Sequence, residues 1–513
     1  MSTGRIIRML SLLLAVSFLC TSVSFVYAKP SGKIVLAAKS QPDTLDPTIA
    51  TGRVDQWSNH ALFDPLLHRN PETLSIGPWL VTSIKNINPT TWELDLKVGV
   101  KFHNGERFDA EAVKFSIERS LDPKMKSPIV KNIDWVKEVQ IINPHKVKII
   151  TLQPYPLAYE RFQNFVIVPP RYIREKGNEY FAKNPVGTGP YKFVKWVSGQ
   201  YIEYEANENY WQEAPSIKTI ILKTVPDDST RIAEVLSGSS DIIFDLLPDQ
   251  VAAIEKSAHT KVASAPSLRV AYVAFDALGK GEKGPFMDKR VRQAVNYAVD
   301  IHSIIKHTML GYGDRTATAL NNMVFGCDPA VEPYPYDPEK AKKLMAEAGY
   351  ANGFECTFYG YGGRFFNSRQ VMEAIMGYLQ KNLNIKTAPK WYDTWPTYGQ
   401  LIRAGKASPM HMGTWGSYST FDAEALYMYL LHKEGVQAYW YTPETDKMME
   451  EAAATVNQER RKEIYYKLQR IVKEEAPWLF MWGQVDLIGM NKRIDWKPSK
   501  DEIVRFYDIK MRK

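Results

Sequence analysis

The side chains that most often carry chemistry are present in this sequence, but their spacing matches none of the common motifs for catalysis. Residues 279–284 read G-K-G-E-K-G and lack the serine or threonine with which a phosphate-binding loop holds magnesium. The sequence contains no G-x-S-x-G motif and therefore offers no site for the nucleophilic serine of an α/β-hydrolase. The 57 acidic residues are too evenly spread for spacing to select a glycosidase pair. We therefore expect no catalytic residues.

Metal-ligating residues are equally dispersed. Nine histidines are scattered along the chain, and the closest two, His302 and His307, are five positions apart. That spacing prevents them from sharing a helical face as the two histidines of H-x-x-x-H do. No C-x-x-C pair and no Cys/His zinc spacing is present. We expect neither a metal site nor a cofactor.

Aromatic side chains are concentrated in one segment. Residues 391–441 contain 12 aromatics in 51 positions, about twice the 12% of the whole chain. Flat apolar walls with a few placed polar groups are typical of a ligand cleft. An enzyme active site and a non-catalytic binding cleft both fit this segment, so both readings stay open here.

Several segments predict elements that could position such a cleft. Trp92, Leu94, Leu96 and Val98 alternate with polar residues, which predicts a half-buried strand over residues 92–98. Asn104-Gly105 is a strong turn signal, and His103 beside it is interpreted as a turn residue. Asp109 then predicts the N-cap of a helix. Asp288 and Asp337 predict two further caps, the second before a proline at the first helical turn.

Residues 184–211 predict a β-hairpin with a special entry. Gly187 and Gly189 stand between prolines, where glycine accepts a positive φ, so we expect a tight, partly left-handed approach. Aromatic residues at period two follow, and Ser198-Gly199 turns the chain into a second strand. Residues 207–211, N-E-N-Y-W, close the unit.

Composition describes an ordinary soluble protein with more than one domain. The chain has 513 residues, 45% hydrophobic and 24% charged, with a formal net charge of +8 and no long basic run. Nucleic-acid binding is therefore not expected. Residues 1–28 carry Arg5 and Arg8 before an apolar run and end in V-Y-A, which predicts a secretory signal cleaved after Ala28. Its removal lowers the formal charge from +8 to +6.

The cysteines leave two questions open. Cys20 raises the alternative of a lipid anchor, although large residues precede it where lipidation needs small ones. Cys327 and Cys356 remain after cleavage, and an oxidising compartment permits a disulfide between them. Sequence alone gives no distance between these two thiols. The bridged and the free state therefore both remain possible.

The order of the motifs resembles that of a known family. G-T-G-P-Y with N-E-N-Y-W at residues 187–211, L-D-P at 45–47 and the run K-V-G-V-K-F-H-N-G-E-R-F-D at 97–109 all resemble words of the extracytoplasmic solute-binding proteins of family 5. D-K-R-V-R-Q-A-V-N-Y-A-V-D at 288–300 and Y-D-P-E-K-A-K-K-L-M-A-E-A-G-Y at 336–350 do so too. These are the dipeptide, oligopeptide and nickel-type capture subunits of ABC importers.

The resemblance implies an α/β fold with two lobes, that of a type II, cluster C-like periplasmic binding protein with mixed sheets. It places the first lobe at residues 29–275 plus 487–513, with an extra subdomain at 68–185. The second lobe would cover residues 276–486. Strands near 268–275 and 477–480 would cross between the lobes.

The resemblance also implies where a ligand binds. Met412 to Asp422 resembles the segment in which a tryptophan lines the pocket, so Trp415, Ser417 and Tyr418 are candidates. An aspartate that pairs with a peptide ammonium in relatives is missing after Trp415. Arg53 and Arg364 could instead make the cleft positive, which favours a neutral-polar or anionic ligand. Further candidates for lining the cleft are Thr51, Trp395 and Tyr398.

The function implied is solute capture in the periplasm for an ABC importer, without chemistry. The ligand would be peptide-like, opine-like or sugar-like, and the partner an inner-membrane ABC permease, with the chain acting as a monomer. Two alternatives stay open: a secreted hydrolase of an oligomeric substrate, and a ligand-sensing subunit of a membrane receptor. Sequence does not separate transport from sensing.

Overall fold

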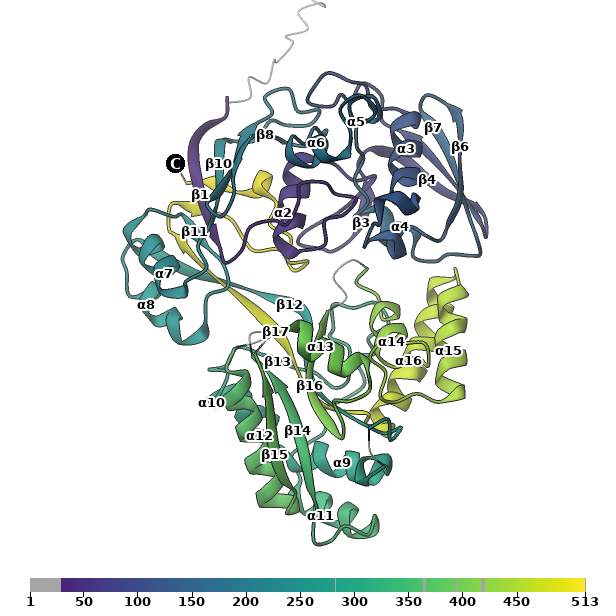
Figure 1. Cartoon of the computed structure of the whole chain (residues 1–513), viewed down its shortest axis with the longest axis vertical. Coiled ribbons are helices and arrows are strands. Elements are labelled where there is room, and N and C mark those ends of the chain that lie inside the picture. The colour runs from purple at the N-terminus through teal and green to yellow at the C-terminus, as the bar shows by residue number, and fades with distance from the viewer. Residues whose placement is uncertain (1–28, 282, 363–365, 394, 417–419, 513) are drawn as a thin grey trace, which may run out of the picture.

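The computed structural model describes residues 29–281, 283–362, 366–393, 395–416 and 420–512. It consists of two lobes joined by two long neighbouring strands, β12 (Thr260–Phe275) and β17 (Trp478–Asn491) (Figure 1). We call the chain before β12 together with the chain after β17 the first lobe, and the chain between these strands the second lobe. The two-lobed α/β fold expected from the resemblance is therefore the fold of this chain.

One mixed sheet runs through both lobes. Its order is β15-β14-β16-β12-β17-β11-β1-β10-β9-β8, with β13 paired to β17. The strands not yet bounded are β1 (Ser31–Ala38), β8 (Tyr191–Val197), β9 (Tyr201–Ala206), β10 (Ile217–Thr224), β11 (Ile242–Ile243), β13 (Asp314–Arg315), β14 (Glu355–Tyr361), β15 (Lys386–Tyr392) and β16 (Met410–Gly416). The domain boundaries expected at 275/276 and 486/487 thus fall at the end of β12 and inside β17.

Among the described residues, the first lobe contains two large cores and a smaller one near α7 (Asp228–Ser237) and α8 (Val251–Glu255). One large core packs around β1, β10 and Trp57; the other lies under a separate antiparallel sheet of order β4-β5-β7-β6, in the region expected to hold an extra subdomain. The small strands are β2 (Leu67–Arg69), β3 (Ile76–Pro78), β4 (Val81–Asn88), β5 (Thr91–Leu96), β6 (Val136–Asn143), β7 (Lys146–Thr151), β18 (Ile494–Asp495) and β19 (Lys510–Met511). The strand expected over 92–98 ends early because the chain bends at Gly99, whose φ is +85°. Val98 is consequently 69% exposed.

Helices cover both lobes. Those of the first lobe are α2 (Arg53–Leu62), α3 (Ala110–Leu121), α4 (Ala158–Phe162), α5 (Pro170–Lys176), α6 (Asn178–Lys183) and α7 (Asp228–Ser237), and α8 (Val251–Glu255) precedes β12. Those of the second lobe are α9 (Lys289–Ala298), α10 (Ile301–His307), α11 (Pro338–Glu347), α12 (Ser368–Leu383), α13 (Trp395–Arg403), α14 (Glu424–Leu430), α15 (Pro443–Ala454) and α16 (Gln458–Glu475). The three expected caps, Asp109, Asp288 and Asp337, each accept a hydrogen bond from a backbone N–H of the first turn and are confirmed.

The hairpin at residues 191–206 is confirmed, but the reason for its glycines is different from the one expected. Neither Gly187 nor Gly189 has a positive φ. Both instead lie against the backbone at the end of α2, where the Gly189 N–H donates to the Leu62 carbonyl at 3.0 Å. A Cβ on Gly187 would lie 2.0 Å from that same carbonyl oxygen. These glycines are needed for close approach of two backbones.

The N-E-N-Y-W motif closes the unit through a buried carboxylate. Asp64 is 2% exposed and accepts hydrogen bonds from the Tyr210 hydroxyl at 2.7 Å and from the Trp211 indole at 2.8 Å. Trp79, between β3 and β4, donates a third at 2.8 Å. Burial raises the pKa of Asp64, and these donors act against that rise. The motif therefore fastens the hairpin to the chain that leaves α2.

Both remaining cysteines are free thiols in the structure, so Cys327 and Cys356 are not bridged. Across the described ranges, no group of three or more His, Cys, Asp or Glu side chains is arranged to hold a metal ion. Within those same ranges, no helix combines the length and the apolar character that a membrane crossing requires.

Candidate ligand-binding site

A cavity of about 520 Å³ opens on the first lobe against β12, one of the two strands that join the lobes. Its walls come from five stretches of the first lobe and from Arg269 of β12: Pro47, Thr48, Ala50, Thr51, Arg53, Gln56, Asn59, Ser116, Ser120, Pro128, Ile129, Asn132, Asn164, Phe165, Val166, Val168, Asp501, Glu502 and Ile503. Pockets for small organic molecules are typically about 300–1,000 Å³, so a solute of that class fits.

The lining is mostly neutral. Hydroxyl and amide side chains alternate with apolar ones such as Ile129, Phe165 and Val168. Such a surface offers hydrogen-bond donors and acceptors together with flat apolar contact, the combination with which pockets orient small solutes. The cavity is thus suited to a polar solute that also carries an apolar portion.

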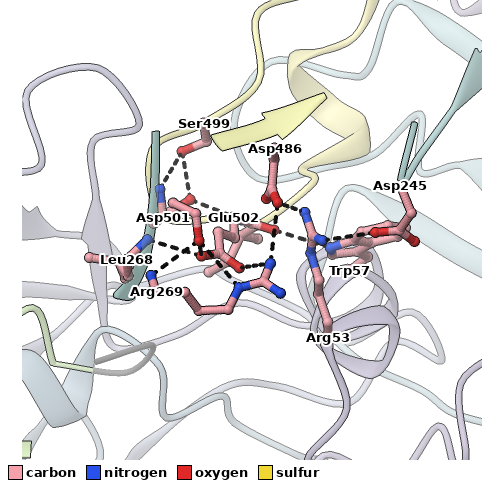
Figure 2. Close-up of polar contacts among 11 residues, drawn as sticks. Arg53, Trp57, Asp245, Leu268, Arg269, Asp486, Ser499, Asp501 and Glu502 are labelled. Atoms are coloured by element: carbon pink, nitrogen blue, oxygen red, sulfur yellow. Dashed lines mark hydrogen bonds and ion pairs between the residues drawn. The ribbon is translucent and has the colours of Figure 1, made fainter. Parts of the chain in front are cut away.

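Arg53 lies at one edge of this cavity and is part of an ion-pair network (Figure 2). Its Nη2 is 2.6 Å from an Asp486 carboxylate oxygen, and its Nη1 is 3.3 Å from one of Asp245. Burial acts to lower the pKa of Arg53, but Asp486 and Asp245 outweigh it and raise that pKa above its usual value. Arg53 lines the cavity, where two carboxylates offset its charge, and its role as a cation that contacts the ligand stays a prediction.

Arg269 shares one of these carboxylates, that of Asp486. Its Nη2 is 3.2 Å from Asp486 and 3.2 Å from Glu502. The two arginines therefore face three carboxylates, those of Asp245, Asp486 and Glu502 (Figure 2). This edge of the cavity carries no excess of positive charge.

The three aromatic candidates among the described residues, Trp415, Trp395 and Tyr398, lie in the second lobe and do not line this cavity. Trp415, on β16, is partly buried, and its ring stacks on Tyr429 with centroids 4.2 Å apart. Tyr398, on α13, is 1% exposed and donates its hydroxyl to the Met412 carbonyl at 2.6 Å, so it is a core residue. Trp395 packs beside it, 5.9 Å from the ring of Tyr361.

Three other candidates, Arg364, Ser417 and Tyr418, lie outside the described residues, and their roles stay predictions. Thr51, in contrast, lines the cavity as the sequence suggested. Of the expected set, the structure therefore brings Thr51 and Arg53 together and places Trp415, Trp395 and Tyr398 on the other lobe.

Sequence reasoning missed a buried cation where the lobes meet. Arg69, at the end of β2, is 4% exposed and forms no ion pair with any described residue. Its Nη1 donates to the Leu74 carbonyl at 2.8 Å, and its guanidinium lies 4.3 Å from the centroid of the Phe421 ring. Leu74 also packs against the second-lobe core. No local pattern marks Arg69, because its partner Phe421 is hundreds of positions away.

His411 lies on β16 four residues before Trp415 and is 2% exposed. Its Nδ1 is 3.0 Å from the Ala407 carbonyl oxygen, and its ring centroid is 4.6 Å from that of Tyr439. Burial lowers the pKa of His411 to about 4. The imidazole is consequently neutral in the folded protein at pH values at which an exposed histidine is charged.

We expect His411 to make the folded state less stable as the pH falls below about 6.5, the usual histidine pKa. Between that pH and about 4, the unfolded chain takes up a proton at this position and the folded chain does not. Replacing His411→Gln should therefore reduce the loss of unfolding free energy between pH 7 and pH 5.5 by about 1 kcal/mol. Urea unfolding at both pH values measures this, with the exposed His259→Gln as the control. An unchanged pH dependence in H411Q would contradict the assignment.

Comparison with known proteins places these features in a family. Residues 75–437 match the family described as bacterial extracellular solute-binding proteins, family 5. Heme-binding protein A of Haemophilus influenzae is 29% identical over 469 residues, which cover 85% of this chain and 84% of that protein. The glutathione-binding protein GsiB of Shigella boydii serotype 4 is 26% identical over 467 residues, covering 87% and 88%.

Solved structures agree on the fold. HbpA2 from Haemophilus parasuis superposes with a TM-score of 0.83 at 22% sequence identity, covering 94% of this chain and 100% of that one. A match at this identity establishes the fold alone. The family match over residues 75–437, most of the chain, shows that the chain belongs to family 5 of the bacterial extracellular solute-binding proteins and has the substrate-binding role of an ABC importer.

Proposed function

We propose that this chain captures a small organic solute in the cavity lined by Thr51, Gln56 and Ile129 and releases it chemically unchanged. The observation that carries the proposal is the position of the cavity, on the first lobe with Arg269 of the connecting strand β12 in its wall. A solute that also touches the second lobe stabilises the closed arrangement by the contacts it makes only there.

The charge of the lining favours a solute without net charge. Arg53 and Arg269 are already matched by carboxylates, and the rest of the lining is mainly neutral. Of the expected classes, we therefore favour uncharged or zwitterionic peptide-like, opine-like or sugar-like solutes over strong anions. The relatives are named for heme and for glutathione, and this diversity gives no narrower class.

Closure is supported by direct contacts between the two lobes. Arg69 and Leu74 of the first lobe meet Phe421 and its neighbours on the second. The guanidinium stacked on an aromatic ring is an attractive contact of about 0.5–2 kcal/mol. Such a contact favours the closed state without fixing it, as reversible capture requires.

Native mass spectrometry of protein purified without unfolding tests the function. We expect a solute at a ratio of about one per chain, released intact by mild denaturation, which also separates binding from hydrolysis. Ile129→Trp should fill part of the cavity and abolish rebinding, measured by calorimetry with the recovered solute. Ile141→Trp, at a 43% exposed position of β6, is the matched control. Turnover of the solute, or full binding by I129W, would contradict the proposal.

The route to the cell exterior is part of the proposal. Arg5, Arg8 and the apolar run that follows support export by residues 1–28, with cleavage after Ala28. The intact mass of the exported protein should then equal that of a chain beginning at Lys29. A mass that includes Cys20 with an added group would instead support the lipid anchor. An inner-membrane ABC permease would receive the solute from the closed protein.

A further inference from the structure

The two connecting strands lose their register at two points, between Pro266 and Val270 and between Ala271 and Tyr272 of β12, and the first shift is the larger. Pro266 pairs with Val485 and Val270 pairs with Gly483, so three residues of β12 face one residue of β17. The three are Ser267, Leu268 and Arg269, which form a β-bulge. Bulges bend the strand that carries them and leave polar groups outside the ladder.

This bulge lies where the sheet passes from one lobe to the other. On one side, β17 pairs with β11 of the first lobe at Gly489 and Met490. On the other side, β12 pairs with β16 of the second lobe from Arg269 onward. The bend in β12 therefore lies between the part of the strand pair that belongs to the first lobe and the part that belongs to the second.

Glu502 binds the polar groups that the bulge leaves outside the ladder (Figure 2). One carboxylate oxygen accepts hydrogen bonds from the Leu268 N–H at 3.0 Å and from the Ser267 hydroxyl. The other oxygen is 3.2 Å from Arg269 Nη2. All three residues of the bulge are thus bound by one side chain, which is 4% exposed.

Glu502 is itself held firmly on the first lobe. Its backbone carbonyl accepts a hydrogen bond from the Trp57 indole of α2 at 3.2 Å (Figure 2). Its φ is +62°, a left-handed conformation that is unfavourable for a residue with a Cβ. A residue that keeps such a backbone conformation is held by its surroundings, here on a segment that also lines the cavity.

We propose that the bulge at residues 267–269 is the hinge of lobe closure and that Glu502 is the positioning residue that sets its angle. The boundary between the lobes then lies at this bulge, within β12, whereas the sequence predicted it at the end of that strand, between residues 275 and 276. Arg269 joins the hinge to the cavity, since it lines the cavity and is bound by Glu502. This inference rests on the proposed function only in that lobe closure serves to capture a solute. The location of the hinge does not depend on that function.

The hinge is tested on ligand-free protein by the distance between spin labels on the two lobes. Lys137 of β6 and Glu459 of α16, both exposed, are replaced by labelled cysteines in a C327S/C356S background. Glu502→Gln keeps an oxygen that accepts from the bulge but removes the charge that holds Arg269. We expect E502Q to shift or broaden the distance distribution by several ångströms, and E502A to do so further.

Asp245→Asn is the matched control, because Asp245 binds Arg53 and makes no contact with the bulge. Its distance distribution should superpose on that of the wild type. A distribution in E502Q equal to that of the wild type, or an equal shift in D245N, would overturn the proposal. Urea unfolding of E502Q checks that the variant remains folded, so E502Q decides the question even if E502A does not fold. The assay needs no solute, so its failure is distinct from failure of solute capture.

Discussion

Replacing Arg461→Leu should lower the free energy of unfolding by about 3–5 kcal/mol, the usual cost of removing one partner of a buried ion pair. Arg461 is 1% exposed and Asp422 is 2% exposed. The guanidinium binds both oxygens of that carboxylate, at 2.5 and 2.7 Å. Burial acts to lower the pKa of Arg461, and Asp422 outweighs it and raises that pKa. Without the guanidinium, the Asp422 carboxylate is left buried and unpaired.

The neighbouring residue provides the control. Arg460 also binds a carboxylate, that of Glu451 at 2.9 Å, but both side chains are about half exposed. Exposed pairs contribute about 0–1 kcal/mol, so Arg460→Leu should change the unfolding free energy by less than about 1 kcal/mol. Urea denaturation of both variants measures the difference. Equal losses in R460L and R461L would show that burial of the pair does not determine its contribution.

The same pair shows why part of the second lobe was not predictable. Asp422 lies just before α14, which begins at Glu424. Nothing local indicates that its carboxylate meets an arginine 39 positions later in the core. Helix caps such as Asp109 were predictable, because a cap and its partners lie within one helical turn.

The candidate site shows the same limit more strongly. Thr51 and Arg53, which the sequence singled out, both line the cavity. The carboxylate that neutralises Arg53 belongs to Asp486, 433 positions away, so the charge of the site could not be read from either segment. Glu502 and Arg69 carry no motif, and their roles follow only from where the fold brings distant segments together.

Replacing Gly187→Ala should lower the free energy of unfolding by at least about 3 kcal/mol, the upper end of the usual cost of overpacking. The added Cβ would lie 2.0 Å from the Leu62 carbonyl oxygen and 2.5 Å from Phe63 Cδ1. One of these is backbone, which cannot move aside as a flexible side chain can. Gly187 is also fixed from the other side, because its carbonyl accepts a hydrogen bond from the His103 N–H at 2.8 Å.

A second glycine should respond in the opposite direction. Gly377 lies within α12 (Ser368–Leu383), and a Cβ there meets nothing within 4 Å. Gly377→Ala should therefore raise the free energy of unfolding by about 0.5–1 kcal/mol, because alanine loses less backbone entropy in a helix. Urea unfolding of the two alanine variants compares them directly. A loss of unfolding free energy in G187A well below about 3 kcal/mol would contradict the prediction. It would mean that the hairpin moves away from α2 at little cost and that the G-T-G-P motif does not serve close approach of the two backbones.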